Sequence, residues 1–262
     1  MKQSRIAAQL FSFRNFIKTP EAVEETFQKL HEIGYEAVQL SSSLAPMPEE
    51  QLRELLDKYH LNPCTSHEQA GMIFDEPEKV IGHLRKLQVT HVAYPSPHKT
   101  LTSLEETVAW AKQLNERALQ FKQAGITLAY HNHHGEFFKI GEKTILELLY
   151  ENAPDIEGEI DTFWVQRGGG CPVEWIRRLD KRMKVLHIKD YGLERKEPES
   201  FWSVECVMRP IGEGTLNWKA ILETAEECGV EWFVVEHDGN CPDPFQSFRT
   251  SFEFLKKHFA TA

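Results

Sequence analysis

Eight short runs of β-branched and aliphatic residues alternate with eight amphipathic stretches along the chain, and this alternation constrains the fold more than any other feature. The predicted strands are 5–11, 37–40, 63–66, 91–94, 127–132, 157–161, 185–188 and 232–236. The predicted helices are 20–33, 48–59, 77–87, 103–125, 143–151, 173–180, 218–228 and 244–259. Strict alternation predicts a parallel sheet, because a crossover between parallel strands is long and usually helical.

Eight strand–helix units over 262 residues favour a closed (β/α)8 barrel, the TIM barrel, over an open doubly wound sheet. Neither GxGxxG nor GxxxxGK with Ser or Thr follows a predicted strand, so the usual nucleotide-binding signals are absent. No Pro-, Gly- or Ser-rich linker divides the sequence. We therefore expect residues 1–262 to form one α/β domain.

Two of the predicted helices carry clear capping signals. Thr19 before Pro20 predicts a helix start, and Gly34 predicts its end. Ser103 followed by Glu106 predicts a capping box at the start of the fourth helix.

Charge and cysteine content narrow the class of protein. Thirty Lys and Arg against forty Asp and Glu leave a net charge of −10, which disfavours a nucleic-acid partner. No apolar run is long enough to span a bilayer, and Gln9, Ser12 and Arg14 interrupt the N-terminal apolar stretch, which we interpret as a strand rather than a signal peptide. Five cysteines without CxxC spacing indicate reduced thiols and a cytoplasmic protein.

The long segment 192–217, between the seventh strand and its helix, is the exception to this compact pattern. Connections of this length are often functional, and the loops after barrel strands surround the active site. We expect it to lie over the active site, with Phe201 and Trp202 as part of a lid. A neutral insertion or a subunit contact is the alternative.

Each of four successive predicted strands has a potential metal ligand at or just after its carboxyl end. These are Glu136, Asp161, His187 and Glu236, and the carboxyl ends of barrel strands converge on one mouth. Crowded carboxylates repel one another unless a cation neutralises them. Mixed oxygen and nitrogen ligands suit Mn²⁺, Mg²⁺, Co²⁺ or Zn²⁺. The alternative is a salt-bridged barrel mouth without a metal.

Five further residues are candidates for substrate binding, each with a structural alternative. His67 lies at the end of the third strand, and its alternative is a solvated loop histidine. His133 follows the fifth strand, and its alternative is a core histidine. Lys189 would hold a substrate oxygen or else pair with Asp190. Trp164 would stack on a sugar face or fill the rim, and Glu213 would bond a hydroxyl or sit in a glycine-flanked turn.

At these positions the sequence resembles the xylose isomerase-like superfamily of sugar isomerases and epimerases, which are (β/α)8 barrels. The matching pieces are AAQLFSFR (7–14), YHNHHGEF (130–137), EIDTFWVQRGG (159–169), LHIKD (186–190), IGEGTLNW (211–218) and VVEHD (234–238). They occur in the family's order over the whole chain. They identify the superfamily but not the substrate, because its members perform several reactions with one site.

The resemblance implies one divalent metal ion, Mn²⁺ before Mg²⁺, Co²⁺ or Zn²⁺, held by Glu136, Asp161, His187 and Glu236. It implies a sugar, keto-sugar or cyclitol substrate that is isomerised or epimerised through a metal-stabilised enediolate. Glu136 and Glu236 would then be the acid–base pair. Barrels of this kind also often form homo-oligomers.

Two departures from the tagatose-type epimerases leave alternatives open. Their DTFH is here DTFW, with Trp164, and their NRFE is NHHGE, which places Glu136 one residue further along. If Glu136 faces away, His131 or His133 would replace it as a ligand. The competing functions are a lyase of the inosose dehydratase type on the same site, an apurinic endonuclease, which the acidic charge disfavours, and a non-catalytic sugar-binding protein.

Overall fold

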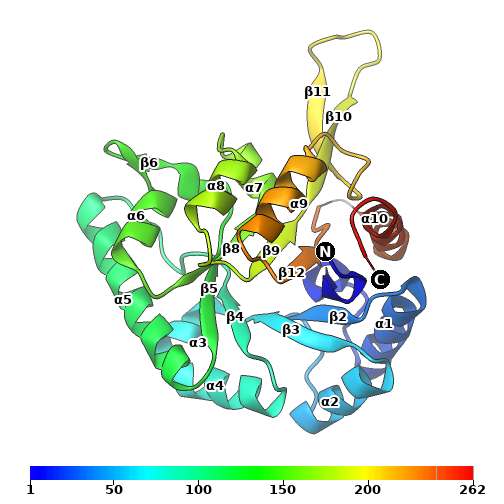
Figure 1. Cartoon of the computed structure of the whole chain (residues 1–262), viewed down its shortest axis with the longest axis horizontal. Coiled ribbons are helices and arrows are strands. Elements are labelled where there is room, and N and C mark those ends of the chain that lie inside the picture. Colours follow the sequence, from blue (N-terminus) through cyan, green and yellow to red (C-terminus); the bar gives the residue numbers. More distant parts are fainter. Residues whose placement is uncertain (240, 262) are drawn as a thin grey trace.

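A computed structural model describes residues 1–239 and 241–261, and its centre is a closed eight-stranded parallel barrel (Figure 1). The barrel strands are β1 (Ile6–Gln9), β2 (Ala37–Ser41), β3 (Asn62–His67), β4 (His91–Tyr94), β5 (Thr127–His131), β8 (Glu157–Asp161), β9 (Val185–Ile188) and β12 (Trp232–Val235). Neighbours in space follow the order of the chain, and β1 pairs with β12 to close the ring. The predicted TIM barrel is confirmed.

A ring of helices covers the outside of the barrel (Figure 1). The helices that follow the strands are α1 (Pro20–Ile33), α2 (Glu49–Lys58), α4 (Pro77–Lys86), α5 (Leu104–Gln123), α6 (Ile145–Asn152), α8 (Pro172–Arg178), α9 (Trp218–Glu227) and α10 (Pro244–His258). Two short helices, α3 (Ala70–Asp75) and α7 (Thr162–Arg167), were not predicted. Within residues 1–239 and 241–261, no helix combines the length and apolar character needed to cross a membrane.

One of the two capping predictions is confirmed and the other is corrected. Thr19 accepts a hydrogen bond from the Ala22 amide, and Gly34 ends α1 with a φ of 117°. Ser103 likewise accepts from the Glu106 amide, but the Glu106 carboxylate bonds Thr102 instead of completing a box. A reciprocal capping box is present at α6, between Thr144 and Glu147.

The barrel interior changes from small apolar residues to polar residues along the strand direction. The amino-terminal end is filled by Ala7, Ala37, Cys64, Val185 and Val234. Side chains two residues further along point the same way, because strand side chains alternate between faces. The carboxyl-terminal half therefore holds buried polar groups, and the packed layer beneath supports them.

The segment after β9 forms an antiparallel hairpin of β10 (Asp190–Arg195) and β11 (Val204–Arg209), which stands out from the edge of the barrel (Figure 1). Phe201 and Trp202 lie near its tip with exposed fractions of 67% and 87%. A shorter hairpin joins β6 (Lys139–Ile140) to β7 (Lys143–Thr144). The predicted strand 5–11 stops at Gln9, whose side chain accepts from the Phe11 amide as the chain enters the 3-10 turn Leu10–Phe13.

Candidate metal centre

Four buried side chains converge at the carboxyl ends of neighbouring strands. His131 ends β5, Asp161 ends β8, His187 lies on β9 and Glu236 follows β12. Each offers one ligand atom, and these four atoms all lie within 4.8 Å of one another. His187 Nδ1 lies 3.1 Å from Glu236 Oε2 and 3.9 Å from Asp161 Oδ2. We call these four residues the mouth cluster.

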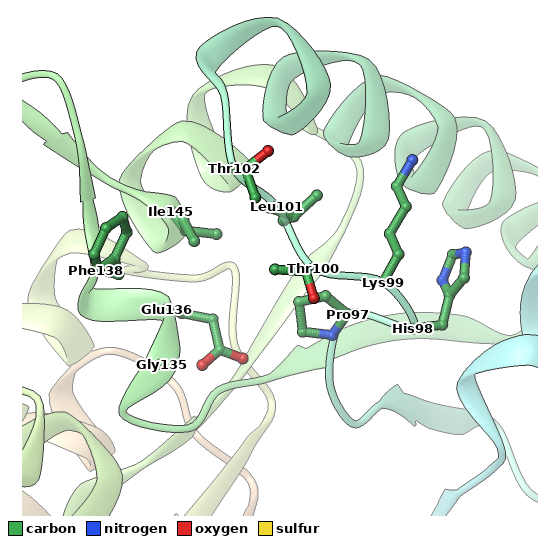
Figure 2. Close-up of a pocket in the computed structure, with 10 residues that line it drawn as sticks. All are labelled: Pro97, His98, Lys99, Thr100, Leu101, Thr102, Gly135, Glu136, Phe138 and Ile145. Carbon is green, nitrogen blue, oxygen red and sulfur yellow. The ribbon is translucent and has the colours of Figure 1, made fainter.

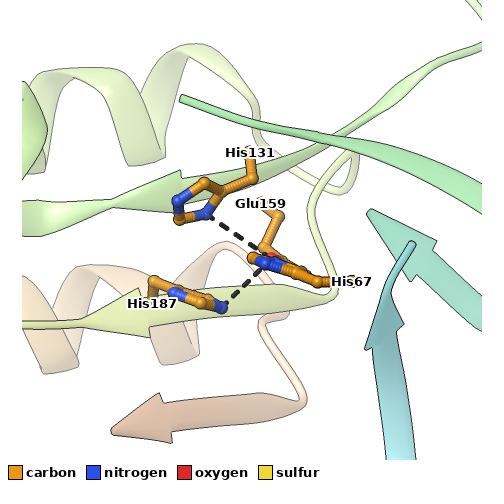
Figure 3. A group of neighbouring side chains, drawn as sticks. All are labelled: His67, His131, Glu159 and His187. Carbon is orange, nitrogen blue, oxygen red and sulfur yellow. Dashed lines mark hydrogen bonds and ion pairs between the residues drawn. The ribbon is translucent and has the colours of Figure 1, made fainter. Parts of the chain in front are cut away.

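A second group adjoins the mouth cluster and shares two of its members. Figure 3 shows His67, His131 and His187 around the carboxylate of Glu159, which has no exposed surface. Glu159 Oε1 is 3.1 Å from His187 Nε2 and 3.5 Å from His131 Nδ1, and it contacts His67 Nε2. We call His67, His131, Glu159 and His187 the inner cluster.

His187 connects the two clusters through its two ring nitrogens. Nδ1 faces Glu236, whereas Nε2 faces Glu159 and lies 2.6 Å from Gln39 Oε1. Gln39 in turn donates from Nε2 to Glu159 Oε2 at 2.9 Å. Nε2 thus faces Glu159 and Gln39, and Nδ1 is the ring nitrogen that faces the mouth cluster. Histidines that bind metals are commonly oriented by a carboxylate or carbonyl in this way.

Lys189 brings a buried positive charge beside the mouth cluster. Its Nζ lies 2.8 Å from Glu236 Oε2, 3.1 Å from Asp161 Oδ2 and 3.2 Å from Asp238 Oδ2. Burial alone would lower the pKa of Lys189, but the nearby carboxylates outweigh it and raise the pKa above its ordinary value. The charged ammonium thus partly neutralises the carboxylates at the mouth.

Burial and the neighbouring charges shift the pKa values of the mouth cluster, and the direction of the shift differs from one residue to the next. Desolvation raises the pKa of Asp161 to about 6. For His187, desolvation would lower the pKa, yet Glu159 and Glu236 raise it to about 10. For Glu236, desolvation is opposed by Lys189 and His187, which hold its pKa well below the ordinary value. A strongly charged, dry site of this kind is typical of cation binding or catalysis.

Glu136 lies outside both clusters. It sits on the 3-10 turn Gly135–Phe137, where its Oε1 accepts from the Tyr130 hydroxyl at 2.6 Å and its Oε2 accepts from the His133 amide at 3.1 Å. Strand β5 ends at His131, so the chain has already turned away from the barrel axis when it reaches Glu136. His131, one of the two alternatives for this ligand, occupies the strand-five position of the mouth cluster.

The other predicted site residues surround the clusters at different depths. His67 and His133 line a hollow of about 180 Å³ above the mouth cluster, together with His131, Glu236 and Asp238. Trp164 lies on α7, and its ring centroid is 5.1 Å from Lys189 Nζ.

Glu213 is exposed on the loop before α9, and Asp190 anchors this loop instead of pairing with Lys189. The Asp190 carboxylate accepts hydrogen bonds from the amides of Tyr191, Gly212, Gly214 and Leu216 and from the indole of Trp218.

Sequence reasoning missed Glu159 and Gln39, although a signal for Glu159 was present. Glu159 precedes Asp161 by two residues on one strand, so both side chains must point into the barrel. Gln39 carries no comparable signal, because its role depends on Glu159, which lies 120 residues further along the chain on a strand that does not pair with β2.

Comparison with known protein families identifies the family of this chain. The model of the family described as "Xylose isomerase-like TIM barrel" matches residues 27–258. The chain belongs to the xylose isomerase-like TIM barrel family. The resemblance seen in the sequence is thereby confirmed.

Within this family, the chain is 25% identical to the rhizopine catabolism protein MocC of Rhizobium meliloti, over 92% of this chain and 82% of that protein. A sugar phosphate isomerase/epimerase from Parabacteroides distasonis superposes with a TM-score of 0.79 at 21% identity, covering 98% and 95% of the two chains.

Two further solved structures share the fold. The probable 3-DHS dehydratase AsbF of Bacillus anthracis has a TM-score of 0.74 at 16% identity, over 98% of this chain and 99% of that one. A xylose isomerase-like TIM barrel protein from Mycobacterium smegmatis, in complex with magnesium, has a TM-score of 0.72 at 15% identity, over 98% and 97%. At these identities the superpositions show the barrel fold alone.

Proposed function

We propose that the protein is a divalent-metal-dependent isomerase or epimerase of a sugar, keto-sugar or cyclitol. The observation that carries this proposal is the mouth cluster, in which two imidazoles and two carboxylates from four strands approach one another in a buried site. The sugar phosphate isomerase/epimerase among the similar structures and the magnesium complex in the same family support it.

The residues present fit a metal ion. Two imidazoles and two carboxylates, all buried, place their donor atoms within 4.8 Å of one another. Two nitrogen and two oxygen donors suit Mn²⁺, Co²⁺ or Zn²⁺, and we propose Mn²⁺ as the resident ion. His131, Asp161, His187 and Glu236 would hold it. When bound there, the ion polarises a substrate carbonyl and stabilises the negative charge that develops on its oxygen.

The surrounding side chains supply orientation and proton transfer. Glu236 reaches both the mouth cluster and the hollow above it, so its carboxylate is placed to take a proton from a substrate carbon or return one. Lys189 holds Glu236 and Asp161 ionised, while the rim residues His67, His133 and Trp164 would contact the substrate. Glu136 does not face this hollow, so the geometry supports Glu236 and not the pair Glu136 and Glu236.

Proton transfer at carbon gives a direct test. Metal-loaded protein is incubated in D₂O with a panel of ketoses and inososes, and products are analysed by mass spectrometry. We expect one deuterium per turnover in a product that otherwise keeps the substrate's mass. Loss of water would instead indicate a lyase of the dehydratase type. Absence of exchange with every member of the panel would contradict carbon acid chemistry at this site.

We also propose a cytoplasmic location and a small-molecule substrate. The five cysteines are free thiols, which supports a reducing, cytoplasmic location. The net charge of −10 supports a small-molecule substrate over nucleic acid. The projecting hairpin β10–β11 is where a subunit contact or a cover for the mouth would form.

A further inference from the structure

A second and larger hollow lies beside the one above the mouth cluster. Its volume is about 670 Å³, against about 180 Å³ for the smaller hollow. It lies between the loop that leads from β4 to α5, the turn that carries Glu136 and the start of α6. Figure 2 shows Phe138, Ile145 and Leu101 on one side of this space, with Pro97 and Thr100 facing Glu136. We call this space the side pocket.

The side pocket and the small hollow are built on the same two loops. After β4, Pro95 lines the small hollow and Pro97 lines the side pocket. After β5, His133 lines the small hollow and Glu136 lines the side pocket, and a hydrogen bond of 3.1 Å joins the His133 amide to Glu136 Oε2. A ligand in the small hollow therefore has the side pocket as its neighbour at the barrel mouth.

The chemistry of the two spaces differs. The small hollow presents imidazoles and carboxylates, which suit a polyol. The side pocket presents Pro97, Leu101, Phe138 and Ile145, and the Phe138 side chain is 66% exposed. An aromatic ring left this exposed beside a functional site gains free energy when a ligand covers it. The volume of the side pocket lies within the range of small-molecule sites.

Polar side chains also line the side pocket, among them His98, Lys99 and Glu136. The Glu136 carboxylate accepts one hydrogen bond at each oxygen, from Tyr130 and from His133. Each carboxylate oxygen has a second lone pair, so Glu136 retains acceptor capacity towards the side pocket. A ring that carries a hydroxyl group matches this combination better than a plain hydrocarbon.

We propose that the substrate carries an apolar ring joined to its polyol part, and that this ring occupies the side pocket while the polyol lies over the mouth cluster. The inference rests on the proposed function for the position of the polyol. It assigns the substrate class: a keto-sugar or a cyclitol ketone that carries an aryl substituent, instead of a free monosaccharide. It also gives Glu136 a binding role in place of metal ligation.

The test compares two probes that differ only in the ring. Methyl and phenyl β-D-glucopyranoside are titrated into the full-length protein by calorimetry, with and without Mn²⁺. Burying a phenyl ring is worth about 1.5–3 kcal/mol, so we expect the phenyl glucoside to bind at least about 10-fold more tightly. Equal dissociation constants, or no binding of the phenyl glucoside at millimolar concentration, would overturn the inference.

Two matched variants locate the effect. Phe138→Ala should remove most of the preference for the phenyl probe, whereas Leu119→Ala, at an exposed residue of α5 that does not line the side pocket, should leave it unchanged. Both positions are exposed, so neither change threatens folding. A preference that survives Phe138→Ala would place the ring elsewhere and refute the assignment.

The titrations distinguish a failure of the side-pocket assignment from a failure of the proposed function. If the protein binds no metal but prefers the phenyl probe, the metal-dependent reaction fails and the side pocket stands. If metal binds and the two probes bind equally, the side pocket fails alone.

Discussion

At the scale of single residues, the sequence and the geometry differ on which residue from strand β5 or its following turn would bind the metal. His131 belongs to the mouth cluster, whereas Glu136 bonds Tyr130 and the His133 amide. We predict that His131→Ala weakens Mn²⁺ binding at least about 100-fold, because a direct ligand is lost, and that Glu136→Gln leaves it within about threefold. Calorimetric titration of metal-stripped protein measures both. The opposite pattern would restore Glu136 as the ligand.

Glu159 acts on the metal site without being part of the mouth cluster. Its buried carboxylate fixes His187 through Nε2, so that Nδ1 is presented to the mouth. We predict that Glu159→Gln weakens Mn²⁺ binding by about 10- to 100-fold, as is usual for the partners of metal-binding histidines. Glu157→Gln, two residues earlier on the same strand, is the control and should bind normally. An unchanged affinity in Glu159→Gln would show that His187 needs no such support.

At the scale of single elements, the capping box of α6 makes a pH-dependent contribution to stability. Bonds from the Thr144 amide and from Arg178 lower the pKa of Glu147 to about 2. Because the folded pKa lies below the ordinary value, this contribution is fully present above pH 4.5 and is lost as the pH falls towards 2.

Glu147→Gln should therefore unfold about 1 kcal/mol more easily than the wild type at pH 6, and this difference should shrink towards pH 3. Urea unfolding at the two pH values measures it. Glu142→Gln removes an exposed carboxylate in the preceding turn and serves as the control. A difference that is constant between the two pH values would contradict the assigned role of Glu147.

The sequence predicts the strands and helices that have a regular hydrophobic period. It misses the elements that depend on contacts between residues distant in the chain. The eight barrel strands and the helices that follow them were predictable because each must bury an apolar face. The helices α3 and α7 were not predicted, since each has only six residues and lies in a loop. The side chain of Asp161 caps the start of α7. Segment 192–217 has no apolar period, and its hairpin depends on pairing between β10 and β11.

At the scale of the whole molecule, the barrel explains why residues far apart in the sequence form one site. The sequence could bring Asp161, His187 and Glu236 together because each lies at or next to the carboxyl end of a strand, and strand ends of a barrel share one mouth. The exchange of Glu136 for His131 was not decided by the sequence, since it depends on where β5 ends. The inner cluster likewise requires the register between strands, such as His131 opposite Glu159 and Asp161 opposite His187.

The central claim is that the mouth cluster binds a divalent metal, and the melting temperature of metal-stripped protein tests it most directly. A ligand at about 100 times its dissociation constant stabilises the native state by about 2.7 kcal/mol. For a chain of this size that is a rise of about 5–10 °C. We predict this rise with Mn²⁺ in the wild type and its absence in Asp161→Ala and His187→Ala. No rise with Mn²⁺, Mg²⁺, Co²⁺ or Zn²⁺ would contradict the account.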